Sequence, residues 1–201
     1  MFTVGITGGI GSGKTTVCKI FELQKIPVFY ADLEAREIMS SDDQLIAEVK
    51  AAFGADIYTS ERTLNRSKLA RLVFNNDSLL AKLNSLVHPA VFRAFDKWVK
   101  RQTALYVIKE AALLFESGSY RDCQATILVK SPHDLKIKRV IERDSIGEAD
   151  ILKRMAKQLS DSEKESLSDY TLQNNEQDLL IPQVLKLHQN FLKLSGSHDI
   201  K

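Results

Sequence analysis

The stretch Gly8-Gly9-Ile10-Gly11-Ser12-Gly13-Lys14-Thr15 decides the fold of this chain. It matches the pattern G-x-x-x-x-G-K-[ST], which is typical of a phosphate-binding loop, or P-loop. The β-branched, apolar run Phe2–Thr7 precedes it, and a helical pattern begins at Lys14. A strand, a glycine-rich loop and a helix in this order point backbone N–H groups and the positive end of a helix at a phosphate. A glycine-rich turn without a ligand is the disfavoured alternative, because its four glycines lose chain entropy and pack nothing.

Outward from the loop, apolar periodicity predicts a parallel sheet. The helix after the loop carries Val17, Cys18 and Phe21 on one face and ends before Pro27, and a second strand is expected at Ile26–Tyr30. Strand, helix and strand within some thirty residues form a βαβ unit. Further strands are expected at residues 105–108, 125–129 and 170–172, followed by a terminal helix. We therefore predict an α/β fold of the P-loop NTPase type, with a five-stranded parallel sheet flanked by helices.

Between the second and third strands the period is helical throughout. Apolar spacing marks three helices around Leu45–Phe53, Leu69–Val73 and Leu79–Leu86, and Pro89 is expected to open a fourth. A polar, charged pair of helices is expected later in the chain, between Pro132 and Leu159. These segments are interpreted as a helical insertion and a lid, both added to the sheet.

We predict a single P-loop kinase domain over residues 1–201. Its core comprises about residues 1–32, 103–133 and 160–201. The helical insertion, which is expected to bind the acceptor substrate, spans about residues 33–102, and the lid spans about residues 134–159.

Composition restricts the partners. Charged residues make up 27% of the chain but the net charge is only +2, so no broad basic surface for nucleic acid or anionic membranes is expected. Cys18 and Cys123 lie far apart in apolar surroundings, which predicts buried, reduced thiols. No apolar run approaches the ~20 residues that cross a bilayer, and no signal peptide is apparent. We expect a cytoplasmic monomer that acts on a small molecule.

A P-loop alone is shared by kinases, GTPases, motors and regulatory proteins. The guanine-specific N-K-x-D pattern is absent from the sequence, and the D-x-x-G at Asp144–Gly147 follows a helical segment instead of a strand. A small-substrate kinase is therefore the favoured class. In such a site Lys14 reaches the β- and γ-phosphates of ATP and the Thr15 hydroxyl ligates Mg²⁺. The expected ATP-binding residues of the loop are Gly9, Gly11, Ser12, Gly13, Lys14, Thr15 and Thr16.

After the second strand comes Asp32-Leu33-Glu34-Ala35-Arg36, a D-x-x-A-R pattern one βα unit beyond the loop. This arrangement resembles the dephospho-CoA kinase family. Further matches continue in order to about residue 192: Phe53-Gly54, Leu64-Asn65-Arg66, Val73-Phe74, His88-Pro89, Leu113-Leu114-Phe115-Glu116, Arg139, Arg143-Asp144, Arg154, Gln158 and Asn174-Asn175. The resemblance implies ATP-dependent phosphorylation of the 3′-hydroxyl of dephospho-coenzyme A, the final step of coenzyme A biosynthesis.

The chain departs from the family pattern at Tyr30, Ala112 and Ser168. Only the first departure touches chemistry, because Tyr30 stands where the family often has a second carboxylate. Asp32 is then expected to act alone as general base for the acceptor hydroxyl. The alternative is a structural role as the N-cap of a helix that begins at Leu33.

The remaining site residues are assigned by charge and by the resemblance. Arg139 and Arg143 lie four residues apart, hence on one helix face, and are expected to cover the triphosphate; a solvated basic face is the alternative. The resemblance places Asn174 and Asn175 near adenine. The expected acceptor-binding residues are Arg36, Arg66 and His88 for pyrophosphate, and Phe53, Phe74 and Leu113 for pantetheine. Helix capping explains His88, and core packing the three apolar residues, equally well.

Two other functions remain open from the sequence. One is a P-loop kinase of a nucleoside or nucleotide. The other is a regulatory module that binds ATP without rapid turnover, against which Asp32 and the arginine pair argue.

Overall fold

The computed structural model describes residues 1–74 and 76–196. The chain divides into two compact units, each described by itself. Met1–Tyr30 and Arg101–Lys201 form what we call the sheet unit, and Ala31–Lys100 forms the helical unit. Within the described ranges, every helix is too short or too polar to cross a membrane.

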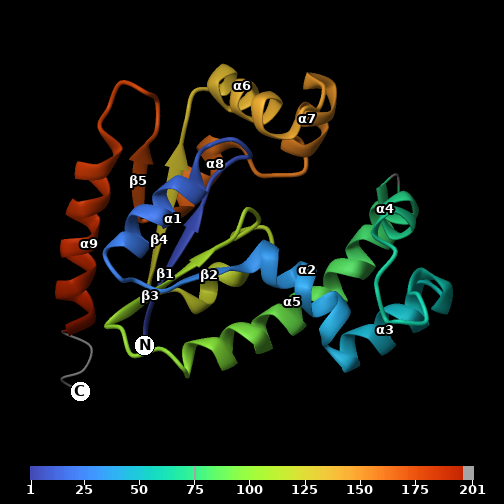
Figure 1. Cartoon of the computed structure of the whole chain (residues 1–201). Helices are drawn as coiled ribbons and strands as arrows, with labels where there is room; N and C mark the ends of the chain where they lie inside the picture. The colour runs from blue at the N-terminus through green and yellow to red at the C-terminus, as the bar shows by residue number, and fades with distance from the viewer. Residues whose placement is uncertain (75, 197–201) are drawn as a thin grey trace. The chain divides into compact units, whose positions relative to one another are not determined.

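The sheet unit contains a five-stranded parallel sheet in the order β2-β3-β1-β4-β5 (Figure 1). Its strands are β1 Phe2–Thr7, β2 Val28–Tyr30, β3 Tyr106–Glu110, β4 Ala125–Lys130 and β5 Tyr170–Gln173. The predicted fold class is confirmed. Ile6 and Tyr30 both pair with Glu110, so the carboxyl ends of β1, β2 and β3 reach one edge of the sheet. Ligands of open α/β sheets bind at this edge.

The helices of the sheet unit are α1 Lys14–Leu23, α6 His133–Asp144, α7 Glu148–Met155, α8 Asp161–Leu167 and α9 Leu180–Gly196, with a 3₁₀ turn at Ser119–Asp122. Their apolar residues meet those of the strands in one core, which includes Val17 and Phe21 of α1 and Phe191 of α9. Each such fully buried side chain contributes about 1.5–3 kcal/mol to folding. Cys18 belongs to this core, as predicted, and Cys123 is half-buried.

Helix α8 was not predicted from the sequence. Its first turn is fixed by a capping box, in which the Ser160 hydroxyl accepts the N–H of Glu163 and the Glu163 carboxylate accepts the N–H of Ser160. A serine followed three residues later by a glutamate is a recognised sign of a helix start. The apolar spacing within α8 is too short to show a helical period, so this cap was the available signal.

The helical unit consists of α2 Ala31–Ser41, α3 Asp43–Phe53, α4 Arg66–Phe74 and α5 Asp77–Val99, with a 3₁₀ turn at Ala55–Ile57. Helix α5 packs against α2, α3 and α4. Asp42 caps α3 by accepting the N–H of Leu45 at 2.8 Å, and Asn76 caps α5 by accepting the N–H of Leu79 at 3.0 Å.

The predicted helix start at Pro89 is wrong, and the alternative role of Asp32 as an N-cap does not hold. Pro89 does not open a helix but lies inside α5, which joins the third and fourth predicted helices. A proline inside a helix loses one backbone hydrogen bond and costs ~3 kcal/mol. Burial of Val87, Val91 and Phe95 on both sides of it offsets that cost. Helix α2 begins at Ala31 instead of Leu33, so Asp32 lies within its first turn and not at an N-cap position.

Candidate phosphate-binding site

The loop between β1 and α1 requires glycine at two positions. Gly11 and Gly13 have φ of 79° and 90°, in the left-handed region that favours glycine. A Cβ atom on Gly11 would overlap the carbonyl oxygen of Lys136 in α6, and one on Gly13 would overlap the side-chain amide of Asn174. Both the backbone conformation and the close approach of neighbouring segments therefore exclude other residues here.

Several backbone N–H groups of the loop make no hydrogen bond within the described part of the protein. Its turn is closed by a hydrogen bond from the N–H of Ser12 to the carbonyl of Gly9 at 3.1 Å. In the part of the chain that the structure describes, the N–H groups of Gly11, Gly13 and Thr15 meet no protein acceptor. Such orphan donors at a helix N-terminus form a ready site for an anion.

The Lys14 side chain folds back across this loop. Its ammonium donates to the carbonyl of Gly8 at 2.9 Å and contacts that of Gly9 at 3.5 Å. A positive charge therefore stands beside the unbonded N–H groups. Thr15 and Thr16, the next residues of α1, are exposed.

Ser12 links the loop to two other segments of the sheet unit. Its carbonyl accepts the side-chain amide of Asn174 at 2.8 Å and the hydroxyl of Ser131 at 3.1 Å. Its own hydroxyl is buried, and within the described residues it has no hydrogen-bond partner. The sequence prediction included Ser12 but not Ser131, which lies in the short connection between β4 and α6.

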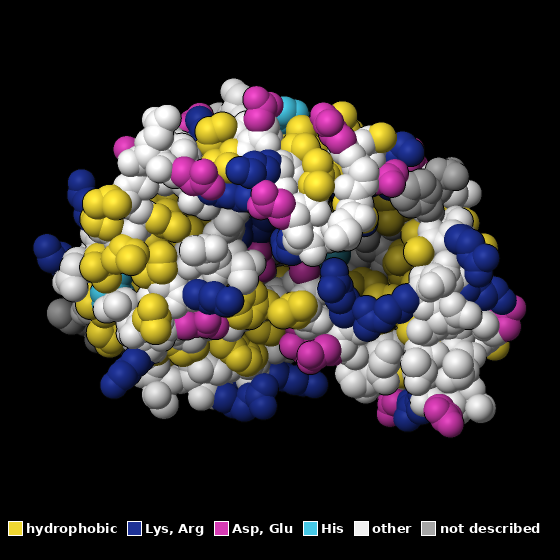
Figure 2. All heavy atoms as spheres, turned by 45° about the horizontal axis from the view of Figure 1, so that its top comes forward, with side chains coloured by type: hydrophobic (Ala, Val, Ile, Leu, Met, Phe, Trp, Pro, Cys, Tyr) yellow, Lys and Arg dark blue, Asp and Glu magenta, His cyan; other side chains and the backbone are white. Residues whose placement is uncertain are grey.

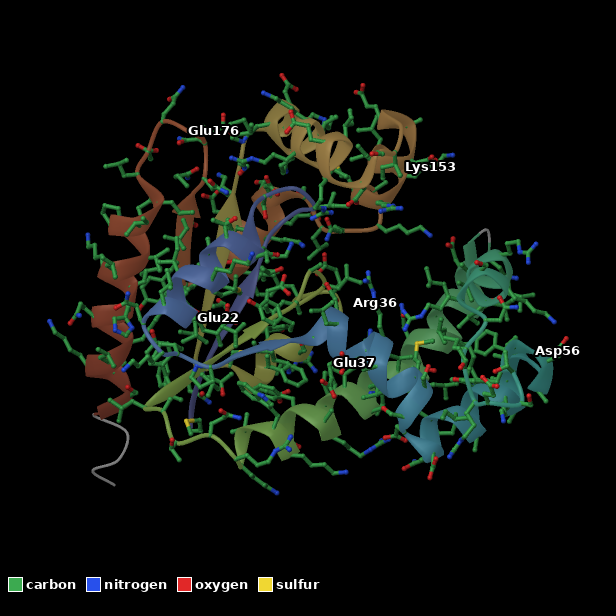
Figure 3. All side chains as sticks on the ribbon, in the orientation of Figure 1. Glu22, Arg36, Glu37, Asp56, Lys153 and Glu176 are labelled. Carbon is green, nitrogen blue, oxygen red and sulfur yellow. The ribbon has the colours of Figure 1, made fainter. Side chains whose placement is uncertain are left out.

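Arg139 of α6 reaches the loop through the same cluster. Its guanidinium donates to the Ser131 hydroxyl at 3.0 Å and to the Asn174 carbonyl at 3.2 Å. A Cβ atom on Gly13 would lie 3.9 Å from Nη1 of Arg139. The other guanidinium nitrogen pairs at 3.2 Å with Glu176, which Figure 3 labels in the turn between β5 and α9. The structure thus brings Arg139 and Lys14 to the same loop.

Two other predicted nucleotide-binding residues have local contacts. The Arg143 guanidinium donates twice to the adjacent Asp144 carboxylate, at 2.7 and 3.0 Å, and holds the pKa of that carboxyl below its ordinary value. Asn175 donates to Asp178 at 2.8 Å and accepts backbone N–H groups of its own turn. Their contacts with a nucleotide stay predictions, whereas Asn174 is the asparagine that contacts the loop.

Glu110 is a site residue that the sequence reasoning missed. It is the last residue of β3, is 7% exposed and pairs in register with Ile6, two residues before the loop. Burial is the main cause that raises the pKa of the Cys18 thiol; the Glu110 carboxylate raises it further, and Lys14 lowers it. Glu110 and Lys14 therefore both lie within electrostatic range of Cys18 in α1. The signal for Glu110 in the sequence was an acidic residue at the end of an apolar strand.

In the helical unit, two predicted acceptor-binding arginines are joined. The Arg66 guanidinium donates to the backbone carbonyl of Arg36 at 2.9 Å, which ties the start of α4 to α2. Both arginines are exposed, and Figure 3 labels Arg36 on α2. Asp32 is also exposed, in the first turn of the same helix.

Three other predicted acceptor-binding residues, His88, Phe53 and Leu113, are partly buried. The His88 ring of α5 lies beside the Phe92 ring at a tilt of 31°, with ring centroids 6.5 Å apart, and burial lowers the pKa of His88. Phe53 ends α3 and is half-buried, as is Leu113, which belongs to the sheet unit. The side chain of Phe74 lies outside the described residues.

Figure 2 shows Lys and Arg side chains interspersed with Asp and Glu over the face that it draws. This mixture agrees with the small net charge of +2. Attraction for a triphosphate therefore depends on individual cations beside the loop, such as Lys14 and Arg139.

The parallel sheet, the loop after its central strand and the lysine folded over that loop define a P-loop kinase of the nucleotide-dependent phosphotransferase class. The family model of dephospho-CoA kinase matches residues 2–179, and the chain belongs to this family. A dephospho-CoA kinase of Salinibacter ruber is 41% identical over 178 residues, which cover 87% of this chain and 89% of the relative.

Solved structures agree on the fold. The crystal structure of a Thermus thermophilus protein superposes with a TM-score of 0.81 at 30% identity and covers 96% of each chain. A dephospho-CoA kinase from Campylobacter jejuni has a TM-score of 0.67 at 22% identity, with 98% of each chain covered. At that identity the second likeness concerns the fold alone.

Proposed function

We propose that this protein transfers the γ-phosphate of ATP to the 3′-hydroxyl of dephospho-CoA, giving coenzyme A and ADP in the final step of coenzyme A biosynthesis. One observation carries the proposal. A loop with unbonded N–H groups stands beside Lys14 and Arg139, in a chain that belongs to the dephospho-CoA kinase family.

The loop is the proposed site for the ATP phosphates. The N–H groups of Gly11, Gly13 and Thr15 donate to phosphate oxygens, and Lys14 exchanges the carbonyls of its own loop for the β- and γ-phosphates. Arg139 stabilises charge on the transferring phosphoryl group, which is the main catalytic requirement of this reaction.

The residues at the loop also fit a magnesium ion. Mg²⁺ prefers oxygen donors and is bound through one or two protein groups together with substrate phosphates. The exposed Thr15 hydroxyl and the Glu110 carboxylate at the end of β3 supply such oxygens. When bound, the ion neutralises charge on the β- and γ-phosphate oxygens. We assign Thr15 as its direct ligand and Glu110 as a supporting carboxylate.

For the acceptor we propose Asp32 as general base. A carboxylate accepts the hydrogen of the 3′-hydroxyl as that oxygen attacks phosphorus. Arg36, Arg66 and His88 are proposed to hold the pyrophosphate, since guanidinium and imidazole groups donate to phosphate oxygens. Phe53, Phe74 and Leu113 are proposed as the apolar wall for pantetheine.

The domain roles belong to the same proposal. The insertion of about residues 33–102, which corresponds closely to the helical unit, binds the acceptor, and α6 with α7 form a lid. We also propose that the enzyme acts as a cytoplasmic monomer. Sedimentation of the purified protein tests the oligomeric state directly.

A substrate comparison tests the function. ADP release from ATP and Mg²⁺ is measured with dephospho-CoA and, separately, with the common nucleoside monophosphates. We expect kcat/KM for dephospho-CoA to exceed that for each nucleotide by at least about 100-fold, an amount that equals ~2.7 kcal/mol of transition-state stabilisation. A preference for a nucleoside monophosphate would establish the nucleotide-kinase alternative. Slow ADP release that no acceptor accelerates would establish the regulatory alternative.

A further inference from the structure

Gln158 connects the phosphate-binding loop to the end of β3. It lies three residues beyond α7, in the sheet unit. Its side-chain oxygen accepts the backbone N–H of Ile10 at 3.0 Å, and its side-chain nitrogen donates to the carbonyl of Ala112 at 3.3 Å. The two ends of one amide thus hold two segments that are about a hundred residues apart in sequence.

The orientation of this amide is fixed by its partners. Ile10 offers only a donor and the Ala112 carbonyl offers only an acceptor, so the oxygen must face Ile10. Lys164 also donates to the Ala112 carbonyl, at 3.0 Å, and the Thr7 hydroxyl approaches it at 3.4 Å. If the amide were flipped, its nitrogen would face the Ile10 N–H and its oxygen would face the Ala112 carbonyl, so neither hydrogen bond could form.

An ion pair of a buried lysine holds the chain beside Gln158. Lys164 is fully buried and pairs with the Glu116 carboxylate at 3.1 Å. The same carboxylate accepts the N–H of Leu159, the residue after Gln158, at 2.8 Å. The backbone on one side of Gln158 is therefore tied to the segment that follows β3, and its side chain has a defined position.

Ile10 is the point at which this support reaches the loop. The N–H of Ser12 bonds inside the loop, to Gly9, whereas the N–H of Ile10 bonds outside it. The loop contains few side chains that pack, so its conformation must be held by backbone contacts. A binding loop that is ordered before its ligand arrives loses less entropy on binding.

We propose that Gln158 is a positioning residue for the nucleotide, which keeps the glycine-rich loop in its phosphate-binding conformation through the Ile10 N–H. The inference rests on the proposed function, because it assigns the loop to ATP. Gln158 itself touches no reacting atom in this assignment. Its effect passes through the direction of the N–H groups at Gly11, Gly13 and Thr15.

Substitution of Gln158 by methionine tests the proposal, since methionine keeps the length of the side chain and removes both hydrogen bonds. Gln124→Met is the matched control. Gln124 accepts the N–H of Thr3 at 2.7 Å, so it also bonds the backbone of β1, but at the strand end opposite the loop. The readouts are the calorimetric Kd for ATP with Mg²⁺ and no acceptor, KM for ATP, kcat, and the midpoint of thermal unfolding.

We expect Gln158→Met to raise both Kd and KM for ATP about tenfold, which corresponds to about 1.4 kcal/mol. Gln124→Met is expected to change neither by more than about twofold, at a similar loss of thermal stability. Equal ATP affinities in the two variants would overturn the proposal and leave Gln158 a purely structural residue.

Gln158→Glu separates the two hydrogen bonds of the amide. It retains an acceptor for the Ile10 N–H and loses the donor to the Ala112 carbonyl. Because the new carboxylate also repels ATP, the Kd values of the variant and the native protein are compared at high ionic strength, which screens this repulsion. There we expect the Kd of the variant to lie within about threefold of the native value, which is about 0.7 kcal/mol. A loss as large as that of Gln158→Met would place the effect at Ala112 and contradict the assignment. Because the Kd is measured without acceptor, it decides the role of Gln158 even if the native enzyme does not phosphorylate dephospho-CoA.

Discussion

The ammonium of Lys14 is bound to carbonyl oxygens of its own loop, at 2.9 Å from Gly8. These contacts compensate the charge in the absence of phosphate, and they are replaceable by stronger charge-assisted bonds to phosphate oxygens. We expect Lys14→Ala to lower kcat/KM by at least about 100-fold, which is ~2.7 kcal/mol. The free energy of unfolding should change by less than about 1 kcal/mol, because the side chain is only half-buried. Steady-state kinetics and thermal unfolding measure both quantities; near-native activity would refute the phosphate assignment.

Asp32 occupies the first turn of α2, where a carboxylate also interacts favourably with the helix dipole. Asp32→Asn keeps the shape and removes the charge, so loss of the dipole interaction alone costs about 0.3–1 kcal/mol of stability. If Asp32 is the general base, the same substitution lowers kcat by about 10²-fold or more. We expect the fall in kcat, with the Kd values of both substrates little changed. Full activity of the asparagine variant would leave the chain without an identified base.

Residues of the loop itself were predictable because their spacing is local. A strand, the glycines and Lys14 form one continuous motif, and the structure places them together. The residues that support the loop from outside, such as Ser131 and Asn174, follow other strands. Their contacts depend on strand order, which no local pattern states. The sequence prediction placed Asn174 and Asn175 alike near adenine, and for the same reason it did not indicate that Asn174 is the one that contacts the loop.

At the scale of an element, helix α6 places Arg139 beside the loop. The backbone of Lys136, in the same helix, lies against Gly11. We expect Arg139→Ala to lower kcat by about 10-fold to 100-fold and to weaken ATP binding by a smaller factor, since its contact tightens as charge moves to the transferring group. Lys138→Ala, an exposed cation on the same helix, is the control and should leave both quantities within about twofold. Single-turnover kinetics with a separate binding measurement distinguish the two effects. An effect on KM alone would reduce Arg139 to a ground-state contact.

Elements were predicted well where the apolar period was long. The strands β1 and β4 were expected at nearly their observed positions because each is a continuous apolar run that is buried on both faces. Helix α1 was expected because its apolar residues repeat over one buried face. The period does not reveal where one helix ends and the next begins. Pro89 was therefore read as a boundary inside α5, although packing on both sides of it keeps the helix continuous.

At the scale of the whole molecule, stability depends on how the helices of the sheet unit pack against its strands. Helix α9 is the last described element, and it joins the central sheet through a polar contact as well as through apolar packing. The Tyr106 hydroxyl on β3 and Nδ1 of His188 on α9 lie 2.7 Å apart, and both side chains are buried. Burial raises the pKa of the Tyr106 hydroxyl, which therefore keeps its proton, and the tautomer of His188 sets which of the two groups donates.

His188 should make stability depend on pH. Burial lowers its pKa, so the unfolded chain binds a proton at a higher pH than the folded chain does. The unfolded state therefore gains protons first as the pH falls, and stability decreases on that side. The His188 contribution is fully present above the unfolded pKa of about 6.5 and is lost as the pH falls below it. Burial also lowers the pKa of His88, which adds to the same trend.

We expect the midpoint of thermal unfolding to fall between pH 8 and pH 5.5, and to fall less in His188→Gln, which cannot be protonated in this range. The comparison concerns the slope with pH, because the substitution also removes a buried contact and lowers stability at every pH. His133→Gln, at an exposed position that starts α6, is the control and should keep the native slope. Equal slopes in the native protein and His188→Gln would show that the His188 imidazole does not cause the acid sensitivity. A smaller slope in His188→Gln alone would locate part of that sensitivity at the contact between β3 and α9.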